Sequence, residues 1–255
     1  MDWRRYVGDS TEQPLDRYPT GISETAIFRT MAFIGDSLSS GEIQSRDAEG
    51  KSHYHDYYEY SWGQYLARKN GFEKAFNFSC GGLSSQRFLE SYVQKHDVWN
   101  SEKICQAYVI ALGVNDLFYF KQDVGTVGDM DIEDSQTIAH YYGNIIRRVK
   151  DVQPRAKIFL VTIPRHGNEQ DERRGELAEL VRAFAEYFDN TYVIDLFRYA
   201  PVFDADFIKQ FFLYGHMTAS GYIFMANMID AYIDYLVRHN PEDFRRVPFI
   251  GTDLE

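Results

Sequence analysis

The sequence predicts a three-layer α/β fold, in which a doubly wound sheet of about five parallel strands carries helices on both faces. Two observations lead to this fold class. Short apolar runs, each about as long as a buried parallel strand, recur along the chain. Longer stretches with helical periodicity lie between them, and this alternation is typical of parallel sheets. The length of 255 residues fits one such domain.

The same patterns assign the individual elements. The apolar runs that predict strands are 31–34, 75–78, 107–112, 158–163 and 192–196. The helical patterns lie around 60–70, 85–96, 135–150, 172–188 and 218–239. Gly71 and Pro154 follow two of these patterns, where residues that end helices are expected. In such sheets, ligands bind beyond the carboxyl ends of the strands, so the residues just after each strand are the candidates for chemistry.

The sequence predicts one domain with two short extensions. Residues 1–29 are polar, contain Pro14 and Pro19, and predict an irregular N-terminal arm that lies on the domain. The domain is expected to cover 30–240, and 241–255 to form a C-terminal tail packed on it. No apolar run precedes residue 31, so we expect no secretory signal, and no apolar run reaches the roughly 18 residues of a membrane span. We therefore expect a cytoplasmic protein that does not enter a membrane.

Charge and cysteine content exclude several classes of function. The formal net charge is -11, so nucleic acid is not expected as a partner. Cys80 and Cys105 are the two cysteines, and they stand too far apart to indicate a disulfide framework or a thiolate metal site. His53 and His55 alternate with other residues in what we expect to be a polar, aromatic loop, and further ligands are missing nearby. We expect neither a metal nor a cofactor.

Four predicted loops carry polar groups that could act together. Gly35-Asp36-Ser37 follows the first strand in a tight turn, where a serine hydroxyl is a candidate nucleophile. Gly82 follows the second strand, and its lack of a side chain lets a backbone N–H approach a ligand closely. Asn115 follows the third strand and offers an amide donor, and His216 precedes the last helix. Because these loops meet at one edge of the sheet, we expect the four residues to converge.

These motifs, in this order, resemble those of the SGNH (GDSL-like) hydrolase family. The resemblance extends from about residue 31 to 222 and implies a flavodoxin-like sheet and hydrolysis of an ester. It also implies the roles of the residues. Ser37 attacks the carbonyl, the N–H groups of Ser37 and Gly82 with the Asn115 amide hold the oxyanion, and His216 transfers the proton. Asp36 and Asp116 are expected to hold their loops through backbone N–H groups.

One position departs from the family pattern. The family usually places an aspartate three residues before the histidine, and Leu213 stands there in this chain. Three explanations remain open for the second ring nitrogen of His216. A backbone carbonyl could accept its proton, which makes a Ser-His dyad; Asp204 or Asp206 could fold back as the third member; or the protein is a weak or inactive enzyme. We favour the dyad, because Asp204 and Asp206 suit the start of a short helix.

The sequence is therefore consistent with two functions. The first is a serine esterase that forms an acyl-enzyme on Ser37, with His216 as general base, and acts on a small-molecule or carbohydrate ester such as an O-acetyl sugar. Aromatic residues at 118–120 and 211–214 flank two of the predicted loops and could form a rim for a sugar ring. The alternative is a catalytically weak or inactive flavodoxin-like module that binds a small ligand. The sequence leaves the oligomeric state undetermined.

Overall fold

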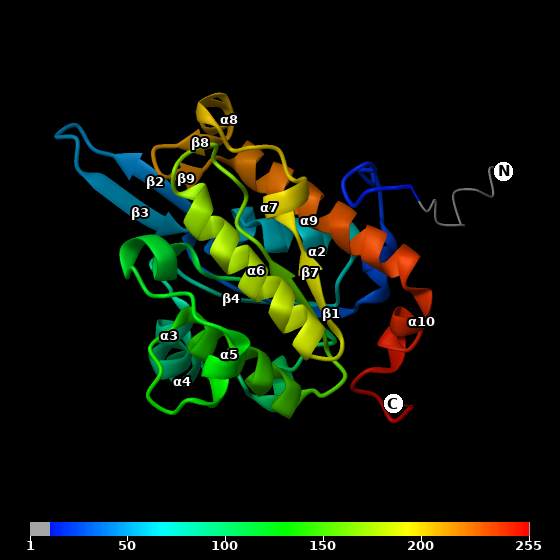
Figure 1. The fold of residues 1–255 in the computed structure, drawn as a ribbon. Helices are drawn as coiled ribbons and strands as arrows, with labels where there is room; N and C mark the ends of the chain where they lie inside the picture. The colour runs from blue at the N-terminus through cyan, green and yellow to red at the C-terminus, as the bar shows by residue number, and fades with distance from the viewer. Residues whose placement is uncertain (1–10, 255) are drawn as a thin grey trace.

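The computed structural model describes residues 11–254 and has at its centre a sheet of five parallel strands (Figure 1). Its strands are β1 (Thr30–Gly35), β4 (Lys74–Ser79), β5 (Ala107–Ala111), β6 (Lys157–Val161) and β7 (Thr191–Ile194). They lie in the order β4-β1-β5-β6-β7, and every neighbouring pair is parallel. This is the flavodoxin-like order. The predicted fold class is confirmed, and each predicted strand overlaps an observed one.

Helices cover both faces of the sheet. The longer ones are α2 (Trp62–Asn70), α5 (Ile138–Val152), α6 (Asp171–Tyr187) and α9 (Ala219–His239). The shorter ones are α1 (Ser37–Ser40), α3 (Ser85–Arg87), α4 (Val93–His96), α7 (Leu196–Tyr199), α8 (Ala205–Phe211) and α10 (Pro241–Phe244). A π-helical segment, Phe88–Tyr92, joins α3 to α4. Figure 1 shows α5 and α6 on one side of the sheet and α2 and α9 on the other.

Strand residues alternate between two hydrophobic cores. In β1, Ile34 packs with residues of α5 and α6, whereas Phe33 packs with residues of α2 and α9. In β5, Ile110 and Val109 divide in the same way. Successive side chains of a strand point to opposite faces, so a strand covered on both sides is apolar at most of its positions. This is why the strands could be recognised as continuous apolar runs.

The helix ends follow from local capping. Ser61 and Thr218 cap α2 and α9 by accepting backbone N–H bonds from Gln64 and Gly221. Gly71 ends α2 with a φ of 69°, the left-handed conformation that glycine adopts without strain. The glycine predicted to stop this helix does so.

The order of the strands creates a switch point at β1. From β1 the chain crosses to β4 on one side, and all later strands add on the other side, beginning with β5. Gly35, at the end of β1, pairs with Ser79 of β4 and Ala111 of β5. The loops that follow these three residues therefore share one edge of the sheet, where doubly wound folds place their ligands.

A two-stranded hairpin was not anticipated. β2 (Glu42–Arg46) and β3 (Ser52–Asp56) pair antiparallel and extend from the body of the protein (Figure 1). We expected a loop around His53, because the segment has no apolar run. The structure shows why: β3 is mostly exposed, and β2 buries Glu42 and Gln44 rather than apolar side chains.

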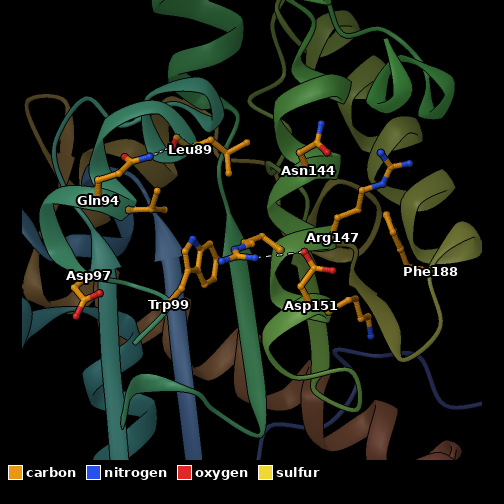
Figure 2. A pocket seen from close by; sticks show the side chains of 11 residues that line it. Leu89, Gln94, Asp97, Trp99, Asn144, Arg147, Asp151 and Phe188 are labelled. Atoms are coloured by element: carbon orange, nitrogen blue, oxygen red, sulfur yellow. Dashed lines mark hydrogen bonds and ion pairs between the residues drawn. The ribbon is translucent and has the colours of Figure 1, made fainter. Parts of the chain in front are cut away.

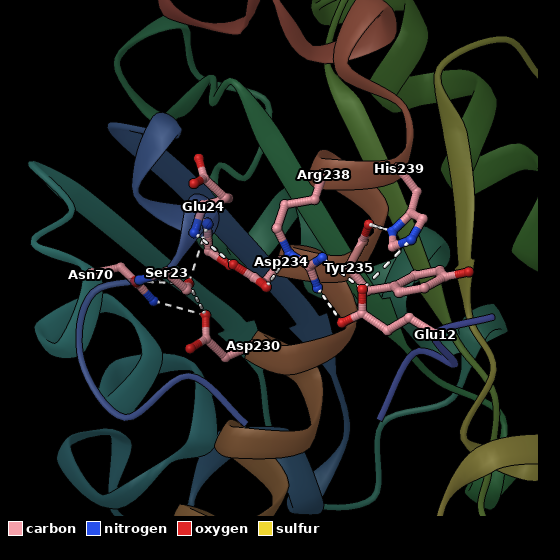
Figure 3. Close-up of polar contacts among 10 residues, drawn as sticks. Glu12, Ser23, Glu24, Asn70, Asp230, Asp234, Tyr235, Arg238 and His239 are labelled. Atoms are coloured by element: carbon pink, nitrogen blue, oxygen red, sulfur yellow. Dashed lines mark hydrogen bonds and ion pairs between the residues drawn. The ribbon is translucent and has the colours of Figure 1, made fainter. Parts of the chain in front are cut away.

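Both ends of the described chain are fastened to the domain. In the N-terminal segment, Glu12 binds Arg238 with both carboxylate oxygens, and Ser23 Oγ donates to Asp230 at 2.7 Å (Figure 3). At the other end, Phe244 and Val247 are buried in the core shared with α9. The division at residues 29 and 240 stays a prediction. Among residues 11–254, no helix combines the length and apolar character needed to cross a bilayer.

Candidate active site

The turn after β1 presents Ser37 at the edge of the sheet. Asp36 caps α1, because its Oδ1 accepts the Leu38 N–H at 2.9 Å, and Ser37 is the first residue of this short helix. Gly35 must be glycine, because a Cβ there would lie 2.2 Å from Ser39 Oγ. Within residues 11–254, the Ser37 hydroxyl makes no hydrogen bond. The hydroxyl is thus held on a rigid turn and left available.

The loops after β4 and β5 are tied to each other. Gly82 has a φ of 72°, and no atom would lie within 4 Å of a Cβ placed on it. Asn115 Nδ2 donates to the carbonyl of Leu83 at 3.0 Å, which leaves the second amide hydrogen free to bind a ligand. Asp116 Oδ1 accepts the N–H of Ser85 at 2.9 Å and also its hydroxyl. These contacts fix the Asn115 amide beside the Gly82 turn.

His216 arrives at the same edge from a second small hairpin. β8 (Phe212–Leu213) pairs with β9 (His216–Met217) through a turn in which Tyr214 has a φ of 59°. Arg46 of β2 lies 4.1 Å above the Tyr214 ring and supports this turn. Cα atoms of β9 lie within 8 Å of Cα atoms of α1 and of β2. The histidine-bearing strand is therefore adjacent to the serine-bearing turn.

The partners of the His216 ring come from β2. Its Nε2 lies 2.8 Å from Glu42 Oε1, and its Nδ1 lies 3.3 Å from Gln44 Oε1. Neither Asp204 nor Asp206 contacts the ring in the described part of the chain. Asp204 caps α8 by accepting the Phe207 N–H at 2.9 Å, and Asp206 lies in the first turn of that helix. A side-chain amide thus faces the nitrogen for which a backbone carbonyl was expected.

A tyrosine connects the hairpin to the nucleophile turn. Tyr222 of α9 is buried, and its hydroxyl lies 2.6 Å from the carbonyl oxygen of Glu42 and 3.3 Å from that of Ser37. Sequence reasoning did not select Tyr222, Glu42 or Gln44. The one available signal was the alternation of polar residues at 42 and 44 around Ile43, which fits a strand with a buried polar face.

Two buried carboxyl groups lie behind the site. Burial raises the pKa of Asp36 to about 7; the Leu38 N–H bond opposes this rise and the nearby charge of Asp116 adds to it. Burial also raises the pKa of Asp116, against the hydrogen bonds from Ser85. His216 and Glu42 are close enough to Asp36 to influence it. The four charged or titratable side chains therefore form one electrostatic cluster.

A small apolar cavity adjoins the nucleophile turn. It has a volume of about 60 Å³ and is lined by residues on both sides of Ser37, namely Asp36, Leu38 and Ser39, and by apolar side chains that include Val114, Ile163 and Met225. An exposed tyrosine also packs against the candidate histidine. Tyr54 packs edge-to-face on His216 with ring centroids 5.7 Å apart, and Tyr57, Tyr60 and Tyr214 are also exposed.

A second cavity, of about 740 Å³, lies away from these residues (Figure 2). Val93 and Trp99 line it, and so do Arg147 and Asp151 near the end of α5. Trp99 precedes β5 and Asp151 precedes β6, so this cavity lies toward the amino ends of the strands, opposite the candidate site. Within residues 11–254, no group of three His, Cys, Asp or Glu side chains is arranged to hold a metal ion.

Comparison with solved structures finds this fold in esterases. A family two carbohydrate esterase from Clostridium thermocellum in complex with cellohexaose has a TM-score of 0.59 at 18% identity, over 88% of this chain and 66% of that chain. A carbohydrate esterase family 2 enzyme with a carbohydrate binding domain, from Corynascus thermopiles (Myceliophthora fergusii), has a TM-score of 0.57 at 15% identity, over 86% and 68%. A family 3 carbohydrate esterase of Clostridium thermocellum has 0.51 at 12%, over 86% and 98%.

Sequence comparison identifies the family. No curated protein matches the chain. The model of the GDSL-like lipase/acylhydrolase family matches residues 33–223, which include the loops after β1, β4 and β5 and the histidine of β9. Since this match spans most of the sequence, the chain belongs to the GDSL-like lipase/acylhydrolase family, as its motifs predicted.

Proposed function

We propose that the protein is a serine esterase that removes a short acyl group, such as acetyl, from a carbohydrate or related alcohol. One observation carries the proposal. The Ser37 turn, the Gly82 turn, Asn115 and His216 belong to four separate segments that meet at the switch-point edge of the sheet. A nucleophile, hydrogen-bond donors and a base are the parts that acyl transfer requires.

The reaction begins at Ser37. Its oxygen attacks the ester carbonyl carbon, and its proton passes to His216. The carbonyl oxygen becomes an oxyanion, for which three donors are available: the N–H groups of Ser37 and Gly82 and the free hydrogen of the Asn115 amide. The C–O bond to the alcohol then breaks, and the alcohol leaves with the proton from His216. Water repeats these steps on the acyl-enzyme and restores Ser37.

Gln44 supplies the contact that an aspartate supplies in a complete triad. Its amide oxygen faces His216 Nδ1 at 3.3 Å, so the hydrogen of the neutral ring sits on Nδ1 and Nε2 is left as the base. The amide is itself held in this orientation, because Gly215 N–H donates to the same oxygen at 3.0 Å and Gln44 Nε2 donates to Ser52 Oγ at 3.0 Å. The Ser-His dyad is thus supported by a neutral acceptor.

The surroundings of the site favour a short acyl group on a sugar. The cavity next to the Ser37 turn is small, about 60 Å³, and mostly apolar, which suits a short acyl group better than a long chain. The exposed rings of Tyr54 and Tyr214 offer flat apolar faces with polar edges, which suit a sugar ring. The carbohydrate esterases that share the fold point in the same direction.

Covalent labelling tests the proposal. A fluorophosphonate probe should add to Ser37, as located by mass spectrometry of peptides, and Ser37→Ala should not label. Ser45→Ala is the matched control, because Ser45 is exposed on β2 and should leave labelling unchanged. Hydrolysis of p-nitrophenyl acetate should exceed that of the butyrate and octanoate esters, because the cavity is small. Folded protein that never labels would contradict the proposal.

One observation favours the alternative of a ligand-binding module without catalysis. Leu213, at the usual aspartate position, is 47% exposed and makes no polar contact with the ring through its side chain, and His216 Nε2 is engaged by Glu42. In that case, acetylated sugars should bind without turnover. Calorimetric binding of an acetylated xylo-oligosaccharide that is recovered intact would support the module and exclude the esterase.

A further inference from the structure

The carboxylate of Glu42 lies inside the proposed reaction centre. Glu42 is 6% exposed, and its Oε1 contacts His216 Nε2 at 2.8 Å. The other oxygen packs on the glycine turn after β4, because a Cβ on Gly81 would lie 2.1 Å from Glu42 Oε2. The backbone of Gly81 does not demand glycine, since its φ is not positive. The missing side chain makes room for this carboxylate.

Both nitrogens of the imidazole are therefore occupied. Nδ1 faces the amide oxygen of Gln44, whose orientation two other hydrogen bonds determine. Nε2 faces a carboxylate oxygen. A carboxylate oxygen accepts hydrogen bonds, so the ring nitrogen that contacts it is the donor, and a nitrogen that carries hydrogen has no lone pair with which to take a proton from Ser37. As the site stands, His216 is not free to act as a base.

We propose that the Glu42 carboxylate blocks the reaction centre of the unliganded protein. It holds His216 Nε2 and must move away before Ser37 can react. This inference rests on the proposed esterase function. An ester positioned for attack needs its carbonyl oxygen at the Gly82 turn and its alcohol oxygen near His216. The Glu42 carboxylate bridges these two places. Its negative charge also opposes the oxyanion that forms there.

The movement required is a rotation of one side chain. The backbone of Glu42 stays anchored, because Tyr222 holds its carbonyl at 2.6 Å, and β2 remains paired with β3. A glutamate side chain has three rotatable bonds and can leave Nε2 while the hairpin keeps its place. Gln44, on the same strand, continues to hold Nδ1. Displacement of Glu42 by the substrate would thus create the base without disturbing the ring.

Variants at Glu42 test this inference with the same fluorophosphonate probe. Glu42→Ala should increase the rate constant for labelling of Ser37 at least about tenfold, because Nε2 is freed and the opposing charge is removed. Glu42→Gln, which keeps the shape and loses the charge, should fall between Glu42→Ala and the wild type. Glu49→Gln removes one charge from the exposed turn of the same hairpin and should label within about twofold of the wild type. Thermal melting verifies that each variant is folded.

The outcomes separate this inference from the proposed function. If the wild type labels and folded Glu42→Ala and Glu42→Gln label equally fast or more slowly, Glu42 is not an obstructing occupant and the inference is overturned. If neither the wild type nor any variant is labelled, the proposed esterase function itself is excluded. Nitrogen-15 NMR of the imidazole gives a readout without activity. Glu42→Ala should change the His216 Nε2 signal, and an unchanged signal would overturn the inference.

Discussion

Two groups of buried carboxylates, one along α9 and one at the edge of the sheet, differ in their partners. Along α9, Asp230 contacts Lys69 Nζ at 2.8 Å. Asp234 contacts Arg238 Nε at 2.8 Å (Figure 3). At the edge of the sheet, the carboxyl groups of Asp36 and Asp116 have only backbone N–H and hydroxyl partners among the described residues, and that of Glu42 faces an imidazole. The first group is paired with permanent cations, and the second is not.

This difference indicates which group serves the fold and which serves the site. A buried carboxylate that is paired with arginine or lysine has little reason to change partner or charge. A buried carboxylate without a cation is held at a cost in stability, and such groups concentrate where chemistry takes place. The carboxylates paired with cations therefore lie under the N-terminal segment, where they stabilise the fold. The carboxylates without a cation lie beside Ser37, where they can change partner or charge.

The largest expected effect concerns the stability cost of Asp36. Its pKa rises from 3.8 in the unfolded chain to about 7 in the fold, a difference that corresponds to about 4 kcal/mol. The cost is absent below about pH 4, where both states are protonated, and complete above about pH 7. The wild type should thus lose stability relative to Asp36→Asn as the pH rises between these values. Asparagine still accepts the Leu38 N–H, so the cap is retained.

Urea unfolding of both proteins across this pH range measures the effect. Asp204→Asn is the matched control, because it also alters an aspartate that caps a short helix, and Asp204 is exposed. Because Asp204 is exposed, the stability of this control relative to the wild type should change much less with pH than that of Asp36→Asn. Parallel curves for the wild type and Asp36→Asn would show that Asp36 is ionised in the fold at no cost.

Asn115→Ala should lower ester turnover by about two to three orders of magnitude, the usual effect of removing one oxyanion donor. Stability should change little by comparison, because the amide makes one hydrogen bond, to the Leu83 carbonyl. Steady-state kinetics and thermal melting of the same sample separate the two effects. Asn168→Ala is a suitable control, since that amide also makes local bonds, to Gln170 and Arg174, and contacts none of the four candidate residues. Wild-type turnover in Asn115→Ala would remove this residue from the proposed mechanism.

Arg238→Ala should destabilise the protein by about 3 kcal/mol, because it leaves the carboxylates of Glu12 and Asp234 largely buried without their cation. Arg245→Ala provides the control: its pair with Glu242 is exposed on both sides and should contribute less than about 1 kcal/mol. Neither change should affect the labelling rate of folded protein. A large loss of labelling in Arg238→Ala would mean that the two carboxylate groups are coupled.

The sequence was sufficient to predict the sheet and the loops that carry the candidate residues at its edge. The central strands β1, β5 and β6 are buried on both faces and read as apolar runs, and the candidate residues could be taken from the segments that follow the strands. Ser37 comes two residues after the end of β1, and Asn115 comes four after the end of β5. Short-range rules of this kind predict where a residue lies along a strand or loop. They do not predict what it touches.

The partners of His216 could not be predicted for that reason. Gln44 and Ser52 belong to a hairpin with few apolar residues, whose position depends on contacts with β9 and with Tyr222 of α9, far away in the sequence. A strand that buries polar side chains looks like a loop when only hydrophobicity is read. The family pattern directed attention to position 213, whereas the acceptor stands on β2.

The smallest expected effect concerns position 213, because Gln44 takes the place of the usual aspartate. Leu213 lies directly across the β8–β9 pair from His216, so Leu213→Asp restores the usual aspartate. It should change the labelling rate of Ser37 by less than about threefold, because Gln44 already holds Nδ1. Gln44→Ala alone should slow labelling, and Leu213→Asp should then restore part of the rate in the double variant. A large gain from Leu213→Asp alone would show that Gln44 does not orient the ring, and that the chain is a catalyst weakened by the loss of its aspartate.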